Sequence, residues 1–243
     1  MRIAILAAGY GTRLYPLTLK VAKPLIPINK KPMLNFLLDK IKLLNRVVGI
    51  EEISIVVNNK FYKSFLAWKK KYKVKAKIIN DGSNSNDDRL GAIKDMKLAI
   101  DSTKSDWLVL GGDNLFEDDL LGFIEFASKN KPFSTIGLYD VKSKQAATRF
   151  GIVGLNKSKR IIKFQEKPAS PASTLAASCI YFFPKKSLKF LNLFVKKNKN
   201  ADAAGKYIGW LSKEDKVFGY TLGGRWIDIG HFSSLKEAEK TFS

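Results

Sequence analysis

The sequence predicts an α/β fold with a doubly wound, mostly parallel sheet, and two observations lead to this prediction. Apolar strand-like runs alternate with helical stripes over the first 140 residues, which is the pattern of successive βαβ units. Glycine- and aspartate-bearing motifs directly follow several of these runs. Because open α/β sheets bind ligands beyond the carboxyl ends of their strands, these motifs mark the candidate site.

Each element is predicted from its hydrophobic periodicity and from the turn residues beside it. In the first half, strands are expected at residues 3–8, 53–57, 77–80, 107–110 and 134–139. Helices are expected between them at residues 33–44, 60–72, 92–100 and 120–129. Beyond residue 140, shorter β-like pieces stand at 151–155, 161–165 and 177–183, before a helix near 186–197. These pieces predict a small β-rich lobe within a single domain spanning residues 1–243.

The composition is typical of a globular protein that does not enter a membrane. Hydrophobic residues make up 45% and charged residues 27%, and no apolar run is long enough to span a bilayer. The apolar N-terminus leads directly into Gly9 rather than into a cleavage site, so it is expected to form a buried strand. The single cysteine, Cys179, cannot form an internal disulfide. A cytoplasmic protein is therefore expected.

A formal charge of +21 indicates an anionic partner. The densest lysine stretch, residues 60–77, contains Phe61, Phe65, Trp68 and Tyr72, which could stack on bases if this face bound nucleic acid. Their spacing of four, three and four residues instead favours an amphipathic helix with the aromatic rings packed inward and the lysines in solvent. No nucleic-acid partner is therefore expected.

A glycine-rich loop follows the first predicted strand and is a candidate phosphate-binding element. Glycines let backbone N–H groups approach phosphate oxygens closely, and an arginine adds a planar fork of donors. The loop matches neither the G-x-G-x-x-G pattern of Rossmann dinucleotide sites nor the G-x-x-x-x-G-K pattern of P-loops, so both kinds of phosphate-binding site are disfavoured. Its candidate nucleotide-binding residues are Leu6, Ala8, Gly9, Gly11, Thr12 and Arg13.

The continuation of this loop and the later motifs resemble the sugar-1-phosphate nucleotidylyltransferases, the family that includes glucose-1-phosphate thymidylyl- and uridylyltransferases. The resemblance covers nearly the whole chain in the family's order. Its motifs are Tyr15-Pro16-Leu17-Thr18, Lys23-Pro24-Leu25-Ile26-Pro27, Leu110-Gly111-Gly112-Asp113-Asn114, Phe150-Gly151-Ile152-Val153, Glu166-Lys167-Pro168 and Arg225-Trp226-Ile227-Asp228-Ile229-Gly230. The resemblance implies that a nucleoside triphosphate reacts with a sugar-1-phosphate and releases pyrophosphate. The favoured candidates are dTTP or UTP for the triphosphate and glucose-1-phosphate for the sugar phosphate. A cytidylyltransferase acting on phosphocholine, inositol phosphate or another small phosphate is the alternative.

The chemistry of this reaction suggests roles that agree with the family's. A sugar phosphate is already largely deprotonated at neutral pH, so catalysis depends on positioning and charge neutralisation. Mg²⁺ prefers hard oxygen ligands, which makes the carboxylates of Asp113 and Asp228 the candidate metal ligands. Arg13 and Lys23, with Asp113 the candidate catalytic residues, are expected to stabilise the reacting phosphates and the departing pyrophosphate.

The resemblance also implies which residues contact the two substrates. Glu166 matches the family's contact to sugar hydroxyls, Lys167 matches its contact to the sugar phosphate, and Gly151 would let the backbone approach the sugar. Residues 1–140 would then form the nucleotide-binding half and residues 141–243 the sugar-binding half.

The segment after the third strand, which reads the base in this family, departs from the family pattern. Asp81 and Gly91 are the candidate nucleotide contacts there, in a turn that is longer and more polar than usual. Ser178-Cys179 would add bulk near the sugar, and Trp226 is expected to pack in the core. His231, the only histidine, is expected to lie at the surface or to cap a helix. The chain ends soon after Gly230, which suggests a monomer or a small homo-oligomer.

Overall fold

The computed structural model describes residues 1–100, 104–198 and 202–242. The strands of its main sheet are β1 (Arg2–Leu6), β4 (Glu52–Val57), β5 (Lys77–Asn80), β6 (Trp107–Gly111), β8 (Ser134–Asp140), β9 (Gly151–Leu155), β10 (Ile161–Glu166), β11 (Leu175–Phe183) and β12 (Val217–Thr221). Two small strand pairs lie outside it, β2 (Pro27–Ile28) with β3 (Lys31–Pro32) and β7 (Asn114–Phe116) with β13 (Trp226–Asp228). The helices are α1 (Leu17–Lys20), α2 (Met33–Leu44), α3 (Tyr62–Lys71), α4 (Ala92–Ala99), α5 (Leu121–Lys129), α6 (Lys144–Ala147), α7 (Leu188–Lys197), α8 (Ala204–Glu214) and α9 (Phe232–Thr241).

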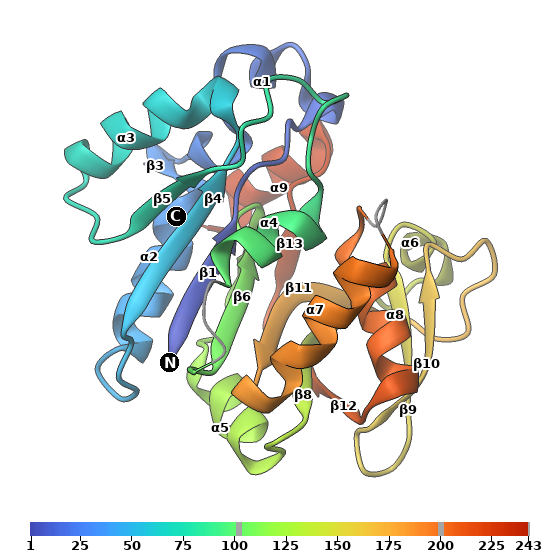
Figure 1. Ribbon diagram of the computed structural model, residues 1–243. Coiled ribbons are helices and arrows are strands. Elements are labelled where there is room, and N and C mark those ends of the chain that lie inside the picture. The colour runs from blue at the N-terminus through green and yellow to red at the C-terminus, as the bar shows by residue number, and fades with distance from the viewer. Residues whose placement is uncertain (101–103, 199–201, 243) are drawn as a thin grey trace.

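The main sheet has the order β10-β9-β11-β6-β1-β4-β5, and β8 pairs with β11 and carries β12 (Figure 1). β1 runs parallel to both β4 and β6, and β4 runs parallel to β5. The sheet therefore has the expected parallel core. β1 lies at the topological switch point, because the chain continues to β4 on one side and to β6 on the other.

The second half of the chain completes this sheet. β11 runs antiparallel between β6 and β8, and only the β9–β10 hairpin extends from it as a small β-rich part. Residues 180–183 of β11 are all buried, because helices cover both faces of the sheet at this point. The strand expected at 177–183 thus belongs to the central sheet, and only the hairpin forms the lobe.

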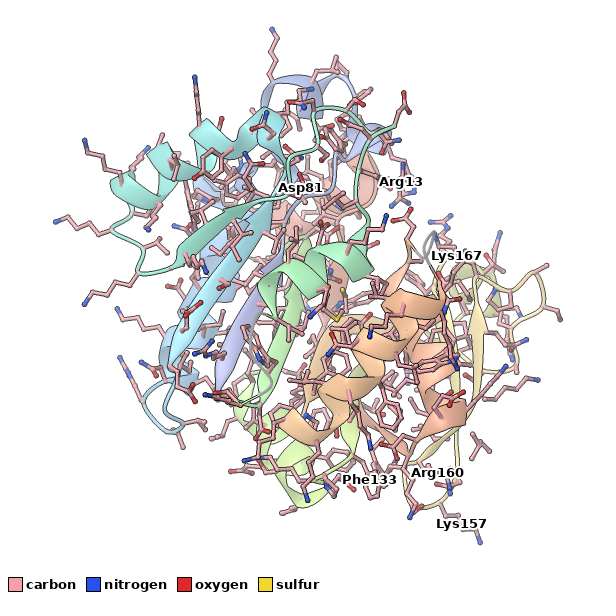
Figure 2. The ribbon with its side chains drawn as sticks, viewed as in Figure 1. Arg13, Asp81, Phe133, Lys157, Arg160 and Lys167 are labelled. Atoms are coloured by element: carbon pink, nitrogen blue, oxygen red, sulfur yellow. The ribbon has the colours of Figure 1, made fainter. Side chains whose placement is uncertain are left out.

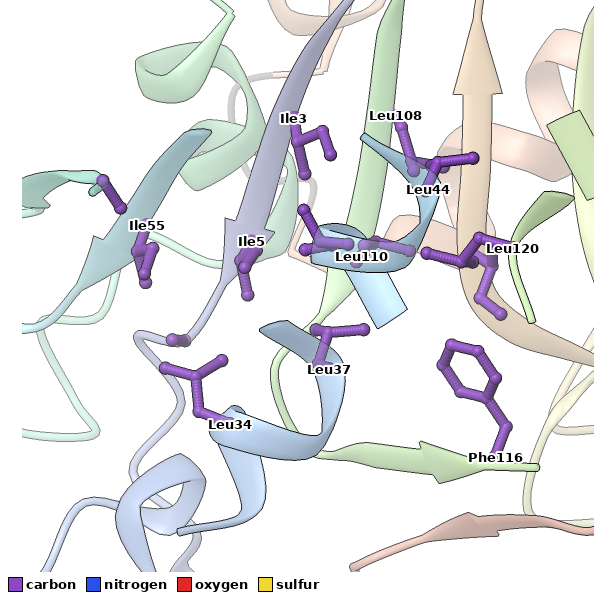
Figure 3. Packing of buried hydrophobic residues seen from close by; sticks show 14 of the residues in the cluster. Ile3, Ile5, Leu34, Leu37, Leu44, Ile55, Leu108, Leu110, Phe116 and Leu120 are labelled. Atoms are coloured by element: carbon purple, nitrogen blue, oxygen red, sulfur yellow. The ribbon is translucent and has the colours of Figure 1, made fainter. Parts of the chain in front are cut away.

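Helices cover both faces of the sheet because side chains alternate along each strand. Ile3, Ile5 and Ile55 point to one face, where they pack with Leu34 and Leu37 of α2 (Figure 3). The alternate residues, including Ala4, Val56 and Val109, point to the other face and pack with α4, α7 and α8 (Figure 1). No helix within the described residues is long and apolar enough to cross a membrane.

The lysine-rich segment forms α3 with most of the expected aromatic stripe inward. Phe61, Phe65 and Trp68 are at most 5% exposed, and Trp68 Nε1 donates to Asn35 Oδ1 at 2.8 Å. Tyr72 was expected to continue the stripe, and this expectation was wrong because Tyr72 is 37% exposed. The helix ends at Lys71, so Tyr72 leaves the helical path and its ring lies against the Lys71 ammonium.

Helices α8 and α9 and strand β12 were not predicted from the sequence. In α8, Gly205 and Gly209 weaken the helical pattern. The structure gives the reason for these glycines, since a Cβ at either position would lie 3.0–3.2 Å from the ring of Phe164 in β10. Their small size lets α8 pack directly on the β9–β10 hairpin.

Candidate active site at the carboxyl edge of the sheet

A cavity of about 630 Å³ opens where β1, β6 and β10 end. Figure 2 shows Asp81, Arg13 and Lys167 along this edge of the molecule. Of the residues expected to bind ligands, the cavity is lined by Arg13, Asp113, Gly151, Glu166, Lys167 and Asp228. The cavity thus lies at the carboxyl edge near the switch point, as the doubly wound fold predicts, whereas Lys23 and the candidate residues of the segment 6–12 do not line it.

The glycine-rich loop leaves β1 in a fixed shape. Ala7 N–H donates to Val56 O at 2.8 Å, and Asn58 Nδ2 donates to Ala8 O at 2.9 Å. Gly11 has a φ of 61°, a left-handed conformation that favours glycine, and the Thr18 hydroxyl donates to its carbonyl at 2.7 Å. This turn starts the short 3₁₀ helix Thr12–Leu14, which presents Arg13 to the cavity. Ala8, Gly9 and Gly11 thus lie on one loop between Leu6, the last residue of β1, and Thr12, the first residue of the 3₁₀ helix.

A small strand pair brings Asp113 and Asp228 together. β13 pairs antiparallel with β7, so that Asp228 lies opposite Asn114, and Ile229 N–H donates to Asp113 O at 3.2 Å. Both aspartates line the same cavity. The pairing of β7 with β13 therefore brings two aspartates far apart in the sequence to one cavity, and their shared metal-binding role stays a prediction.

Lys23 forms an ion pair with Asp113. Lys23 Nζ lies 2.6 Å from Asp113 Oδ2, with the lysine side chain only 8% exposed, and Asn114 Nδ2 donates to Asp113 Oδ1 at 2.8 Å. Burial by itself would raise the pKa of Asp113, but the ammonium of Lys23 outweighs it and holds the pKa below its ordinary value. Asp113 is therefore ionised at neutral pH.

Asp228 has the opposite shift. Burial, and then repulsion from Asp113, raise the pKa of Asp228 to about 6, although Lys23, Arg13 and Lys167 oppose this. A divalent cation between the two carboxylates would remove the repulsion. Among residues 1–100, 104–198 and 202–242, no cluster of three or more His, Cys, Asp or Glu residues is arranged to hold a metal. Two carboxylates fit Mg²⁺, which commonly takes its other oxygen ligands from phosphates and water.

The end of β10 forms another wall of the cavity. Glu166 is its last residue, and burial raises the pKa of Glu166, partly offset by Lys167 and Lys206. Lys167 has a φ of 43°, a left-handed backbone unusual for lysine, and its N–H donates to Phe150 O at 3.1 Å. The bend at Lys167 places the carboxyl group of Glu166 and the ammonium of Lys167 next to each other at the cavity wall.

Asp81 and Gly91 do not line this cavity. Asp81 follows β5 and accepts hydrogen bonds from the N–H and hydroxyl of Ser83 at 2.7 and 2.8 Å. Asp202 covers Gly91, since a Cβ at Gly91 would lie 2.9 Å from Asp202 Cα. Asp202 is paired with Arg89 at 2.7 Å. The expected base-contacting segment thus lies outside the cavity, beside the Arg89–Asp202 pair.

Sequence reasoning missed Arg149 as a cavity residue. It lines the cavity immediately before the Phe150-Gly151 motif, and a cation next to that motif was the available signal. Cys179, expected near the sugar, also lines the cavity from an irregular part of β11 with a φ of 56°. Burial and then Asp113 raise the pKa of Cys179 to about 12, so it remains a neutral thiol. Trp226 is 7% exposed and packs with Tyr139 and Phe150, as expected.

A helix-covered mixed sheet with a parallel core, a glycine-rich loop and paired carboxylates at its switch point defines a nucleotide-binding α/β domain. The family model described as nucleotidyl transferase matches residues 3–243. The chain belongs to the nucleotidyl transferase family.

Comparison with individual proteins agrees with this family. The chain is 32% identical to the bifunctional protein GlmU of Methanocaldococcus jannaschii over 240 residues, which are 99% of this chain and 54% of that protein. It is also 32% identical to GlmU of Methanococcus aeolicus, over 98% of this chain and 53% of that protein. The chain thus spans about half the length of these relatives. A Bacillus anthracis structure in complex with sucrose, assigned as a glucose-1-phosphate thymidylyltransferase, shares the fold with a TM-score of 0.85 and 24% identity, over 99% of this chain and 94% of that one.

Proposed function

We propose that the chain is a magnesium-dependent sugar-1-phosphate nucleotidylyltransferase that uses dTTP or UTP and glucose-1-phosphate. The name of the Bacillus anthracis neighbour supports the thymidylyl donor and the glucose-1-phosphate acceptor. An oxygen of the sugar phosphate attacks the α-phosphorus of the triphosphate. The bond from that phosphorus to the bridging oxygen breaks, and pyrophosphate leaves. The products are a nucleotide sugar and pyrophosphate.

Residues 1–140 would form the nucleotide-binding half. The backbone of the loop from Leu6 to Thr12 binds the triphosphate, and Arg13 at its end donates hydrogen bonds to phosphate oxygens. Asp81 and Gly91, which lie outside the cavity beside the Arg89–Asp202 pair, would contact the base. The Lys23 ammonium neutralises Asp113 at 2.6 Å in this structure. A metal bound at Asp113 would free the Lys23 ammonium to bind the phosphates.

Asp113 and Asp228 would hold the Mg²⁺. The bound metal would supply charge neutralisation at the phosphate oxygens. Support comes from the raised pKa of Asp228, which burial raises most and the charge of Asp113 raises further, because a bound cation would offset both effects on the carboxylate. The protein also aligns the two substrates, which lowers the entropic part of the barrier.

Residues 141–243 would form the sugar-binding half. Lys167 binds the phosphate of the sugar-1-phosphate, Glu166 accepts hydrogen bonds from sugar hydroxyls, and the Gly151 backbone lines the sugar. Because this phosphate is already ionised at neutral pH, the reaction needs no general base from the protein. With one cysteine and no expected membrane or nucleic-acid partner, we place this reaction in the cytoplasm, carried out by a monomer or a small homo-oligomer.

The observation that carries the proposal is the meeting of Asp113, which is paired with Lys23, and Asp228 at the cavity that Arg13 and Lys167 also line. The test is a panel of dTTP, UTP, CTP, ATP and GTP against several sugar-1-phosphates and phosphocholine, with pyrophosphate release and product mass as readouts. The expected product is a sugar nucleotide that forms only when magnesium is present. CDP-linked product from phosphocholine alone would favour the cytidylyltransferase alternative, and no product from any pair would refute the proposal.

A further inference from the structure

The guanidinium of Arg13 is held by the loop that follows Asp228. Arg13 Nη1 lies 3.2 Å from Nε2 of His231. Arginine has donors only, so the ring nitrogen of His231 must accept this hydrogen bond. Arg13 therefore approaches the cavity with one donor used by the protein and its remaining N–H groups available to a ligand.

His231 also begins helix α9. It is the N-cap residue, and the Ser234 hydroxyl accepts from His231 N–H at 3.1 Å and donates to His231 O at 2.9 Å. This confirms the expectation that His231 caps a helix. A neutral imidazole has one acceptor nitrogen and an imidazolium has none, so the contact to Arg13 requires the neutral ring with its proton on Nδ1, and Nδ1 then cannot accept from the helix.

Gly230 makes room for the guanidinium. A Cβ at Gly230 would lie 3.2 Å from both Nη1 and Nη2 of Arg13 and 3.3 Å from Cζ. The guanidinium therefore packs directly against the backbone of Gly230. The segment Asp228–His231 thus supplies one proposed metal ligand, a surface for Arg13 and the acceptor that orients it.

The charges around His231 favour the neutral ring. Burial and then Arg13, Arg149 and Lys23 lower the pKa of His231. These cations come from three different segments, while Glu237 of its own helix and Asp228 line the same cavity. At neutral pH the ring is therefore available as an acceptor for Arg13.

We propose that His231 is a positioning residue, which orients Arg13 so that its guanidinium meets the triphosphate without first having to be ordered. This inference rests on the function proposed above. Holding a flexible arginine in place before binding reduces the entropy lost when the ligand arrives. His231 acts through Arg13 and is not required to touch the substrate.

Two substitutions separate the contact to Arg13 from the N-cap position. His231→Asn places an oxygen near the position of Nδ1, which can cap α9 but does not reach Arg13. His231→Gln places its amide near the position of Nε2, which can accept from Arg13 but caps the helix poorly. Asparagine is among the strongly preferred N-cap residues, whereas glutamine is not.

The experiment measures kcat, the KM for the triphosphate and the melting temperature of the native chain, both variants and Arg13→Ala. We expect His231→Asn to keep or raise the native melting temperature and to raise the triphosphate KM about tenfold, the effect of losing one hydrogen bond to a charged group. We expect His231→Gln to keep the native melting temperature and a near-native KM. As the pH falls and the ring becomes protonated, the native KM should rise more steeply than that of His231→Gln, because protonation of Asp228 affects both chains.

A native KM in His231→Asn, together with an impaired Arg13→Ala, would overturn the positioning role and leave His231 as a helix cap only. Activity that increases as the pH falls would also overturn it, because the imidazolium would then be acting as a donor to phosphate. If the native chain forms no product with any substrate pair, the proposed function fails instead. Equilibrium binding of the triphosphate to the same variants then tests the positioning role, and equal affinity of the native chain and His231→Asn would refute it.

Discussion

Asp95 should make the stability of this protein depend on pH. The residue lies in the first turn of α4, is 6% exposed, and its Oδ1 has no hydrogen-bond partner among the described residues. Burial and then the charges of Asp81 and Asp202 raise the pKa of Asp95 to about 7. In the unfolded chain the group ionises near pH 4. The folded state therefore loses stability as the pH rises from about 4 to about 7, and the loss is complete above that range.

The size of the effect follows from this pKa difference. About three units at about 1.4 kcal/mol each give a penalty of roughly 4 kcal/mol at pH 8, against roughly 1.6 kcal/mol at pH 5. Asp95→Asn removes the titration. Relative to the native chain, the variant should therefore gain about 2–3 kcal/mol more in free energy of unfolding at pH 8 than at pH 5.

The assay is urea denaturation of the native chain and Asp95→Asn at both pH values. The difference corresponds to a shift in melting temperature of about 5–10 °C for a domain of this size. Asp87→Asn, the same change at an exposed aspartate of the preceding loop, is the control for the loss of one charge. A stability difference between Asp95→Asn and the native chain that is equal at pH 5 and pH 8 would refute the reasoning.

Four further predictions concern the site, the surface charge and the assembly state. Asp113→Asn and Asp228→Asn should each lower turnover by about 10²-fold or more, and full magnesium-dependent activity in either would contradict their metal-binding role. Calorimetry should show that Asp113→Asn melts at a lower temperature than the native chain, because it leaves the buried Lys23 ammonium without its partner at 2.6 Å. Above pH 6, Asp228→Asn should keep or raise the melting temperature, because it removes a buried carboxylate that Asp113 repels. Nucleic-acid binding should be weak and should fall steeply with salt in a filter-binding titration. Sequence-selective binding at about 0.2 M salt, where exposed charges are strongly screened, would count against the interpretation that the lysines form a solvated surface. Light scattering should give the mass of a monomer or a dimer, and a stable tetramer or hexamer would contradict this.

The sequence by itself determined the parallel core and the local character of the candidate site. β1, β4, β5 and β6 were predictable because each is a short apolar run bounded by turn residues, and that signal is local. The glycine-rich loop was predictable for the same reason, since a left-handed turn at Gly11 requires a residue without a side chain. The resemblance to the family added the order of the motifs.

Only the tertiary structure decided which distant segments meet. Asp113 and Asp228 approach each other through the pairing of β7 with β13, two strands of three residues whose own sequence signal is too short to detect. β11 lies inside the main sheet because packing of helices on both faces buries it, a property that its periodicity does not specify. The hydrogen bond between Arg13 and His231 joins positions 218 residues apart. Such contacts depend on the pairing and packing of the whole chain, whereas sequence patterns report the preferences of neighbouring residues.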